Sequence, residues 1–180
     1  MACVVRDWRL QLRETLPGFF APAPGTRRSR PVLPECGQGW CCVVDRLCVR
    51  IAAALDEGES FRFESIGQRD GALRVRWAGR LSAASEAAVR SAIDLAEARS
   101  LCVCELCGAR GKLFRADGVL ATRCPEHAEG VPARGPGMEH VHLIQVTVVG
   151  RLRTIVGVRY DFEIDSFVEI DDVATLRAEA

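Results

Sequence analysis

Two pairs of soft metal ligands constrain this chain more than any other feature of its sequence. Cys104 and Cys107 form the first pair, Cys124 and His127 form the second, and each pair encloses two residues. A Zn²⁺ ion takes four such donors in a tetrahedron, and a C-x₂-C turn presents two sulfurs to one ion. The spacing therefore predicts one structural zinc site, in a zinc ribbon or knuckle over residues 102–128.

The residues between the two pairs have the pattern of a β-hairpin. Asp117-Gly118 is a strong hairpin-turn signal, and strand-like residues flank it at 112–115 and 119–122. Gly108 directly follows the second cysteine, where a knuckle turn commonly needs a positive φ. We expect the hairpin to fold the second ligand pair back onto the first.

Two alternatives to a structural zinc site remain open. The cysteines could be buried thiols without a metal, or the zinc could be catalytic. Catalytic zinc usually keeps three protein ligands and one open position, whereas four candidate ligands close the shell here. Cys102 is not included in this ligand set and is interpreted as a spare thiol.

Composition limits the classes of function. Among 180 residues, 48% are hydrophobic and the formal net charge is zero, which argues against non-specific adhesion to nucleic acid or membranes. No apolar run approaches the ~20 residues of a membrane helix, and the first residues do not resemble a signal peptide. We therefore expect a cytoplasmic protein, in which the nine cysteines form a metal site plus free thiols, without disulfides.

Hydrophobic periodicity predicts an α+β core over residues 1–128. Helical spacing of apolar residues indicates helices at about 4–16, 40–56 and 83–100. Between the last two, Phe61, Phe63 and Ser65 alternate with Arg62, Glu64 and Ile66, and residues 73–78 alternate after Asp70-Gly71. These strands should form a small antiparallel sheet with one apolar face.

A Gly/Pro-rich linker at 129–137 separates this core from a C-terminal β-ribbon at 138–180. The ribbon has strand candidates at 140–149, 152–164 and 167–170. Its acidic side chains are either a solvated strand face or a docking surface for a basic partner. His140 and His142 share one face of a strand, which suits a metal, although exposed histidines of this kind are often incidental.

Four short motifs resemble those of a family of uncharacterised bacterial and tailed-phage proteins. They are Cys36-Gly37-Gln38-Gly39-Trp40, Ala96-Glu97-Ala98-Arg99-Ser100, Cys104-Glu105-Leu106-Cys107-Gly108 and Thr122-Arg123-Cys124-Pro125-Glu126-His127. The family also has a hairpin rich in basic and aromatic residues. This chain differs most from the family there, since only Gly71, Leu73 and Arg74 match that hairpin. The resemblance covers about 10–128, implies metal binding, and implies no particular activity.

The sequence favours a binding function over an enzyme. It contains no Gly-rich phosphate loop and no nucleophile elbow. We expect a zinc-stabilised protein-interaction or accessory protein, with a nucleic-acid-binding zinc ribbon as the alternative. Residues 100–135 carry five basic and four acidic side chains, which do not make a basic stripe. Candidate partner contacts are Arg110, Lys112, Phe114, Arg115 and Arg123 on the hairpin, and Asp161, Glu163 and Asp165 on the ribbon.

Overall fold

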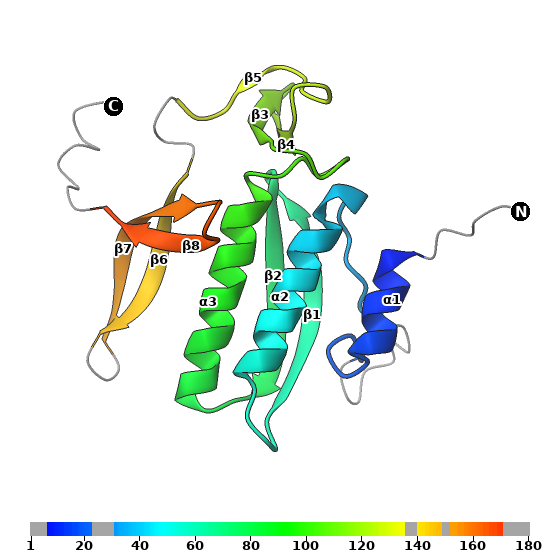
Figure 1. The fold of residues 1–180 in the computed structure, drawn as a ribbon, viewed down its shortest axis with the longest axis vertical. Helices are drawn as coiled ribbons and strands as arrows, with labels where there is room; N and C mark the ends of the chain where they lie inside the picture. Colours follow the sequence, from blue (N-terminus) through cyan, green and yellow to red (C-terminus); the bar gives the residue numbers. More distant parts are fainter. Residues whose placement is uncertain (1–6, 23–30, 136–139, 149–151, 171–180) are drawn as a thin grey trace, which may run out of the picture.

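The computed structural model describes residues 7–22, 31–135, 140–148 and 152–170 (Figure 1). It confirms the predicted α+β class. Its α-helices lie close to the predicted ranges, and a single 3₁₀ turn leads into the second of them. The helical elements are α1 (Trp8–Thr15), η1 (Gln38–Trp40), α2 (Cys41–Ala54) and α3 (Ala83–Ser100).

The strands form three separate antiparallel sheets in the described residues. The first contains β1 (Ser60–Arg69) and β2 (Ala72–Arg80). The second has the order β4-β3-β5 and consists of β3 (Lys112–Ala116), β4 (Val119–Arg123) and β5 (Val131–Pro132). The third has the order β6-β7-β8 and consists of β6 (Val141–Val148), β7 (Leu152–Asp161) and β8 (Ser166–Glu169).

The main hydrophobic core lies where α2 and α3 pack against each other and against the β1–β2 sheet (Figure 1). Trp40, Leu47 and Phe63 are among its fully buried side chains. The strict alternation expected in β1 is interrupted by a register shift between Phe63 and Ser65. The shift leaves Ser65 exposed and turns Ile66 into the core, because a β-bulge reverses which face later residues occupy.

The C-terminal sheet lies beside α3 and is joined to both long helices through one carboxylate. Asp165 lies in the β7–β8 turn with a φ of 51° and is 9% exposed. Its side chain pairs with Arg46 and Arg50 of α2 at 3.0 and 2.9 Å, and with Arg99 of α3 at 3.2 Å. The Tyr160 hydroxyl donates a further hydrogen bond to it. The ribbon is thus docked on the helices and adds no strand to the β1–β2 sheet.

Candidate metal centre

A tight knuckle directly after α3 presents the first ligand pair. The Cys104 N–H donates to the Ala109 carbonyl at 2.7 Å, and the Gly108 N–H donates to the Cys104 carbonyl at 2.9 Å. Gly108 has a φ of 82°, a conformation that glycine adopts without a steric penalty. The turn therefore holds Cys104 and Cys107 on one side of a short loop.

The β3–β4 hairpin returns the chain to this knuckle as predicted. Asp117 and Gly118 have φ values of 49° and 80°, which suit a two-residue turn with the right twist for a hairpin. Lys112 pairs with Arg123 at the open end of the hairpin. Cys124 follows directly, and a turn closed by the His127 N–H and the Cys124 carbonyl (3.0 Å) presents the second ligand pair.

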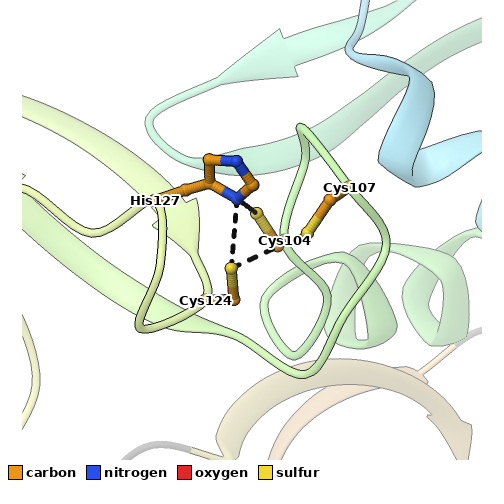
Figure 2. Close-up of side chains that lie close together, drawn as sticks. All are labelled: Cys104, Cys107, Cys124 and His127. Carbon is orange, nitrogen blue, oxygen red and sulfur yellow. Dashed lines mark hydrogen bonds between the residues drawn. The ribbon is translucent and has the colours of Figure 1, made fainter.

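The four predicted ligands converge on one point (Figure 2). All four ligand atoms lie within 4.8 Å of one another. The Cys107 and Cys124 sulfurs are 3.7 Å apart, and His127 Nδ1 lies 3.7 Å from the Cys104 sulfur. Donors about 2.3 Å from a tetrahedral ion lie roughly 3.8 Å apart, so the cluster fits an ion of that size. Three thiols and one imidazole are a donor set typical of structural zinc sites.

The environment of Cys104 favours the thiolate, which is the form that ligates metals. Burial by itself raises the pKa of this thiol. Backbone N–H groups of Cys107, Cys124 and Leu106 act in the opposite direction, and the net result is a pKa lowered to about 6. The backbone of the knuckle therefore stabilises the negatively charged Cys104 thiolate where a cation would bind.

The knuckle is braced by the segment that leads into α2. The Gly39 N–H donates to the Glu105 carbonyl at 2.7 Å, and Gly37 N–H donates to the Glu105 carboxylate at 3.0 Å. Trp40 Nε1 donates to the Val103 carbonyl at 2.8 Å. A Cβ on Gly39 would lie only 2.1 Å from the Cys104 carbonyl oxygen, so no other residue fits there. Sequence reasoning treated Cys36–Trp40 as a helix entry and missed this contact.

Cys102 lies outside the ligand cluster. Its buried sulfur is 3.6 Å from the Ala98 carbonyl oxygen and 3.4 Å from His140 Nδ1. Burial raises the pKa of this thiol to about 11, although Arg110 and Arg99 oppose the effect. Cys102 therefore connects the knuckle to the C-terminal sheet as a neutral thiol.

His140 and His142 do not act together. His140 contacts Cys102, whereas the His142 ring packs against the rings of Tyr160 and Phe167, with centroids 6.3 and 6.0 Å away. Within the part of the chain that the structure describes, neither histidine belongs to a cluster of metal ligands. The metal-binding alternative for this pair is therefore unsupported.

The basic side chains predicted as partner contacts are dispersed. Arg123 donates to the Glu105 carboxylate at 3.1 Å, and the Arg110 guanidinium lies 3.7 Å from the centroid of the Phe162 ring. Lys112 and Phe114 share one face of β3, and alternation places Arg115 on the other. No continuous basic stripe forms from these residues.

The predicted acidic docking surface is smaller than the sequence suggested. Asp165 is buried in ion pairs within the chain, so its carboxylate serves the fold and does not face a partner. The Asp161 carboxylate accepts hydrogen bonds from the N–H groups of Glu163 and Ile164, which caps the β7–β8 turn. Glu163 itself is exposed.

Comparisons of the chain with protein-family models, with curated proteins and with solved structures find no match. The interpretation of the site therefore rests on its own geometry. Among the described helices, none combines the length and the apolar character needed to cross a membrane.

Proposed function

We propose that this chain is a zinc-stabilised, cytoplasmic protein-interaction or accessory protein, in which zinc has a structural role. The observation that carries the proposal is the closed set of four ligands built against the core. Cys104, Cys107, Cys124 and His127 would hold the ion. When bound, zinc supplies a rigid crosslink between the knuckle and the turn after β4, and four protein ligands leave no open position for a substrate.

One face of the β4-β3-β5 sheet is suited to a protein partner. Leu113 and Thr122 lie against the core, because both approach Gly71: a Cβ there would meet Leu113, and Thr122 Oγ1 donates to the Gly71 carbonyl at 2.7 Å. Alternation and register place five apolar residues on the opposite face. We call this the outer face; it consists of Phe114, Ala116, Val119, Ala121 and Pro132.

The outer face is accessible and apolar. Val119 is 66% exposed and Pro132 is also exposed, while Phe114 is half-buried near the middle of β3. Lys112 borders the same face. Phe114 is the aromatic centre of this face, and aromatic residues including Phe are enriched in protein interfaces, whose rims are polar.

Nucleic-acid binding, the alternative function, receives less support from this arrangement. Affinity for a phosphate backbone requires several accessible cations on one surface. Arg110 and Arg123 are engaged by Phe162 and Glu105, and Arg115 lies on the opposite side of the sheet from Lys112. A protein partner on the outer face requires fewer rearrangements.

We also propose that the chain belongs to the bacterial and tailed-phage family that its motifs resemble. Two of these motifs touch: Gly39 of the Cys36–Trp40 segment donates to Glu105 of the knuckle. Gly37 also donates to Glu105, and Trp40 donates to Val103. These contacts give a physical reason for Gly37, Gly39 and Trp40 to occur together with the C-x₂-C turn.

The proposal is tested with two surface variants of matched exposure. Val119→Glu places a charge on the outer face, and Val49→Glu places one on an α2 site that is 61% exposed. A partner captured by the wild type should be lost by Val119→Glu and kept by Val49→Glu, with zinc content equal in both. DNA titration should show no steep salt dependence. A steep salt slope, or equal partner binding by both variants, would contradict the proposal.

A further inference from the structure

A second pair of sulfur atoms converges at the start of α2, away from the metal centre. Cys41 and Cys42 are consecutive helical residues, and their Sγ atoms are 3.7 Å apart. Successive helical residues project about 100° apart and ordinarily do not face each other. The short distance therefore means that the two side chains turn toward the same space.

That space is a groove between α1 and the first turn of α2. Its volume is about 360 Å³, and both cysteines line it together with Trp8, Gln11, Leu12, Thr15 and Asp45. Cys42 is exposed and Cys41 is half-buried, so a small solute can reach both sulfurs. The Trp8 indole N–H is buried and lacks a hydrogen-bond acceptor among the described residues. The groove thus presents two sulfurs to solvent.

A disulfide between these residues is disfavoured by geometry. Disulfide-bonded cysteines have Cα atoms about 4.4–6.8 Å apart, whereas adjacent residues are fixed at about 3.8 Å. Closing the bond would therefore distort the first turn of α2. Two thiols that converge but are disfavoured from joining are suited to chelation.

We propose that Cys41 and Cys42 form a second soft-ligand site, which binds trivalent arsenic or a similar pyramidal thiophilic centre through two thiolates. An atom about 2.3 Å from each sulfur would bridge the present separation at an angle of roughly 107°. That angle suits a pyramidal centre, whereas a linear two-coordinate ion would need the sulfurs about 4.6 Å apart.

The binding reaction is a ligand exchange without electron transfer. Arsenous acid, As(OH)₃, loses two hydroxyl groups as two molecules of water, with protons supplied by the two thiols. Two As–O bonds break, two As–S bonds form, and arsenic stays trivalent.

The test uses the zinc-loaded full chain titrated with arsenite and examined by native mass spectrometry. We expect one arsenic per chain with zinc retained. Cys41→Ser and Cys42→Ser should each weaken arsenic binding by about a hundredfold or more, because one thiol loses the benefit of chelation. Cys102→Ser serves as the control and should bind as the wild type does.

Circular dichroism and zinc content establish that each variant is folded. Since Cys42 is exposed, Cys42→Ser decides the matter if Cys41→Ser unfolds. Three results would overturn the proposal: arsenic that displaces zinc from the ligand cluster, binding unchanged in Cys42→Ser, or uptake of Cu⁺ by the cysteine pair without uptake of arsenite.

Discussion

Trp40 Nε1 donates a hydrogen bond of 2.8 Å to the carbonyl of Val103, one residue before the first metal ligand. Trp40 is fully buried in the main core, so this bond ties the knuckle to the interior of the protein. A buried indole N–H that loses its acceptor costs about 1–3 kcal/mol. The metal centre and the core are therefore expected to stabilise each other.

Purified protein should contain one zinc per chain. Cys104→Ser and Cys124→Ser should lose the metal, because each removes a buried sulfur from the ligand cluster. Cys102→Ser should keep it, since that sulfur contacts Ala98 and His140 instead. Elemental analysis measures the stoichiometry. Loss of zinc from Cys102→Ser together with its retention in His127→Ala would show that the ligand set is different.

Zinc removal should unfold at least the segment that contains the ligands. Structural zinc contributes on the order of 10–16 kcal/mol in finger peptides, comparable to the ~5–15 kcal/mol stability of a whole domain. Melting with and without a strong chelator, and proteolysis between residues 108 and 123, measure the effect. An unchanged melt and a protected hairpin in zinc-free protein would contradict a structural role.

Gly39→Ala should destabilise the protein by about 1–3 kcal/mol, as overpacking typically does. The added Cβ would lie 2.1 Å from the Cys104 carbonyl oxygen and 2.5 Å from the Gly108 nitrogen, and neither backbone atom can move without disturbing the knuckle. Gly18→Ala is the matched control, because nothing lies within 4 Å of its Cβ position. Denaturant unfolding of both variants gives the comparison; equal stabilities would contradict the close approach.

Asp165→Asn should loosen the C-terminal sheet. The substitution leaves Arg46, Arg50 and Arg99 without their shared carboxylate. We expect a loss of about 2 kcal/mol, below the roughly 3–5 kcal/mol of a fully buried pair, because Arg46 and Arg50 reach solvent. Glu86→Gln is the control; it breaks an exposed pair with Arg90 and should cost about 0.5 kcal/mol or less. Faster proteolysis of residues 140–170 in Asp165→Asn alone is the expected readout.

His142 should make stability depend on pH in mild acid. Burial, with Arg134, His140 and Arg74 nearby, lowers the pKa of His142 to about 4, against about 6.5 in an unfolded chain. The unfolded state then takes up a proton that the folded state does not, so stability falls as the pH decreases from about 6.5 to 4. The melting temperature of His142→Leu should change less between pH 7 and 5 than that of the wild type.

Acid also weakens zinc binding, because protons compete for the thiolates. The loss of zinc affects the wild type and His142→Leu equally. The difference between their pH profiles therefore gives the contribution of His142 to the pH dependence of stability. Parallel profiles with equal zinc content would show that His142 titrates normally in the folded protein.

The local elements and the metal ligands could be predicted from the sequence because their signals are short-range. A C-x₂-C turn, an Asp-Gly hairpin and a helical apolar stripe each depend on residues only a few positions apart. The ranges of α2, α3 and the β3–β4 hairpin agree with prediction within two residues for this reason.

Contacts between distant segments could not be predicted in the same way. Gly39 and Glu105 meet across the fold, and no local pattern identifies the partner of a glycine that needs room. Asp165 was interpreted as part of an exposed acidic face because Asp161, Glu163 and Asp165 occupy every second position, as they would on one face of a strand. The turn at 162–165 breaks that alternation, and three arginines from two helices compensate for burying the charge.

The shared carboxylate of Asp165 has a consequence for how the chain is made. Both arginine-bearing helices precede residue 165 in the chain, so a ribosome synthesises the three arginines before the carboxylate that pairs with them. The carboxylate can leave water at low cost only after α2 and α3 have packed and brought their guanidinium groups together. We therefore expect the C-terminal sheet to dock only after α2 and α3 have packed together, so that its docking would indicate correct assembly of these helices.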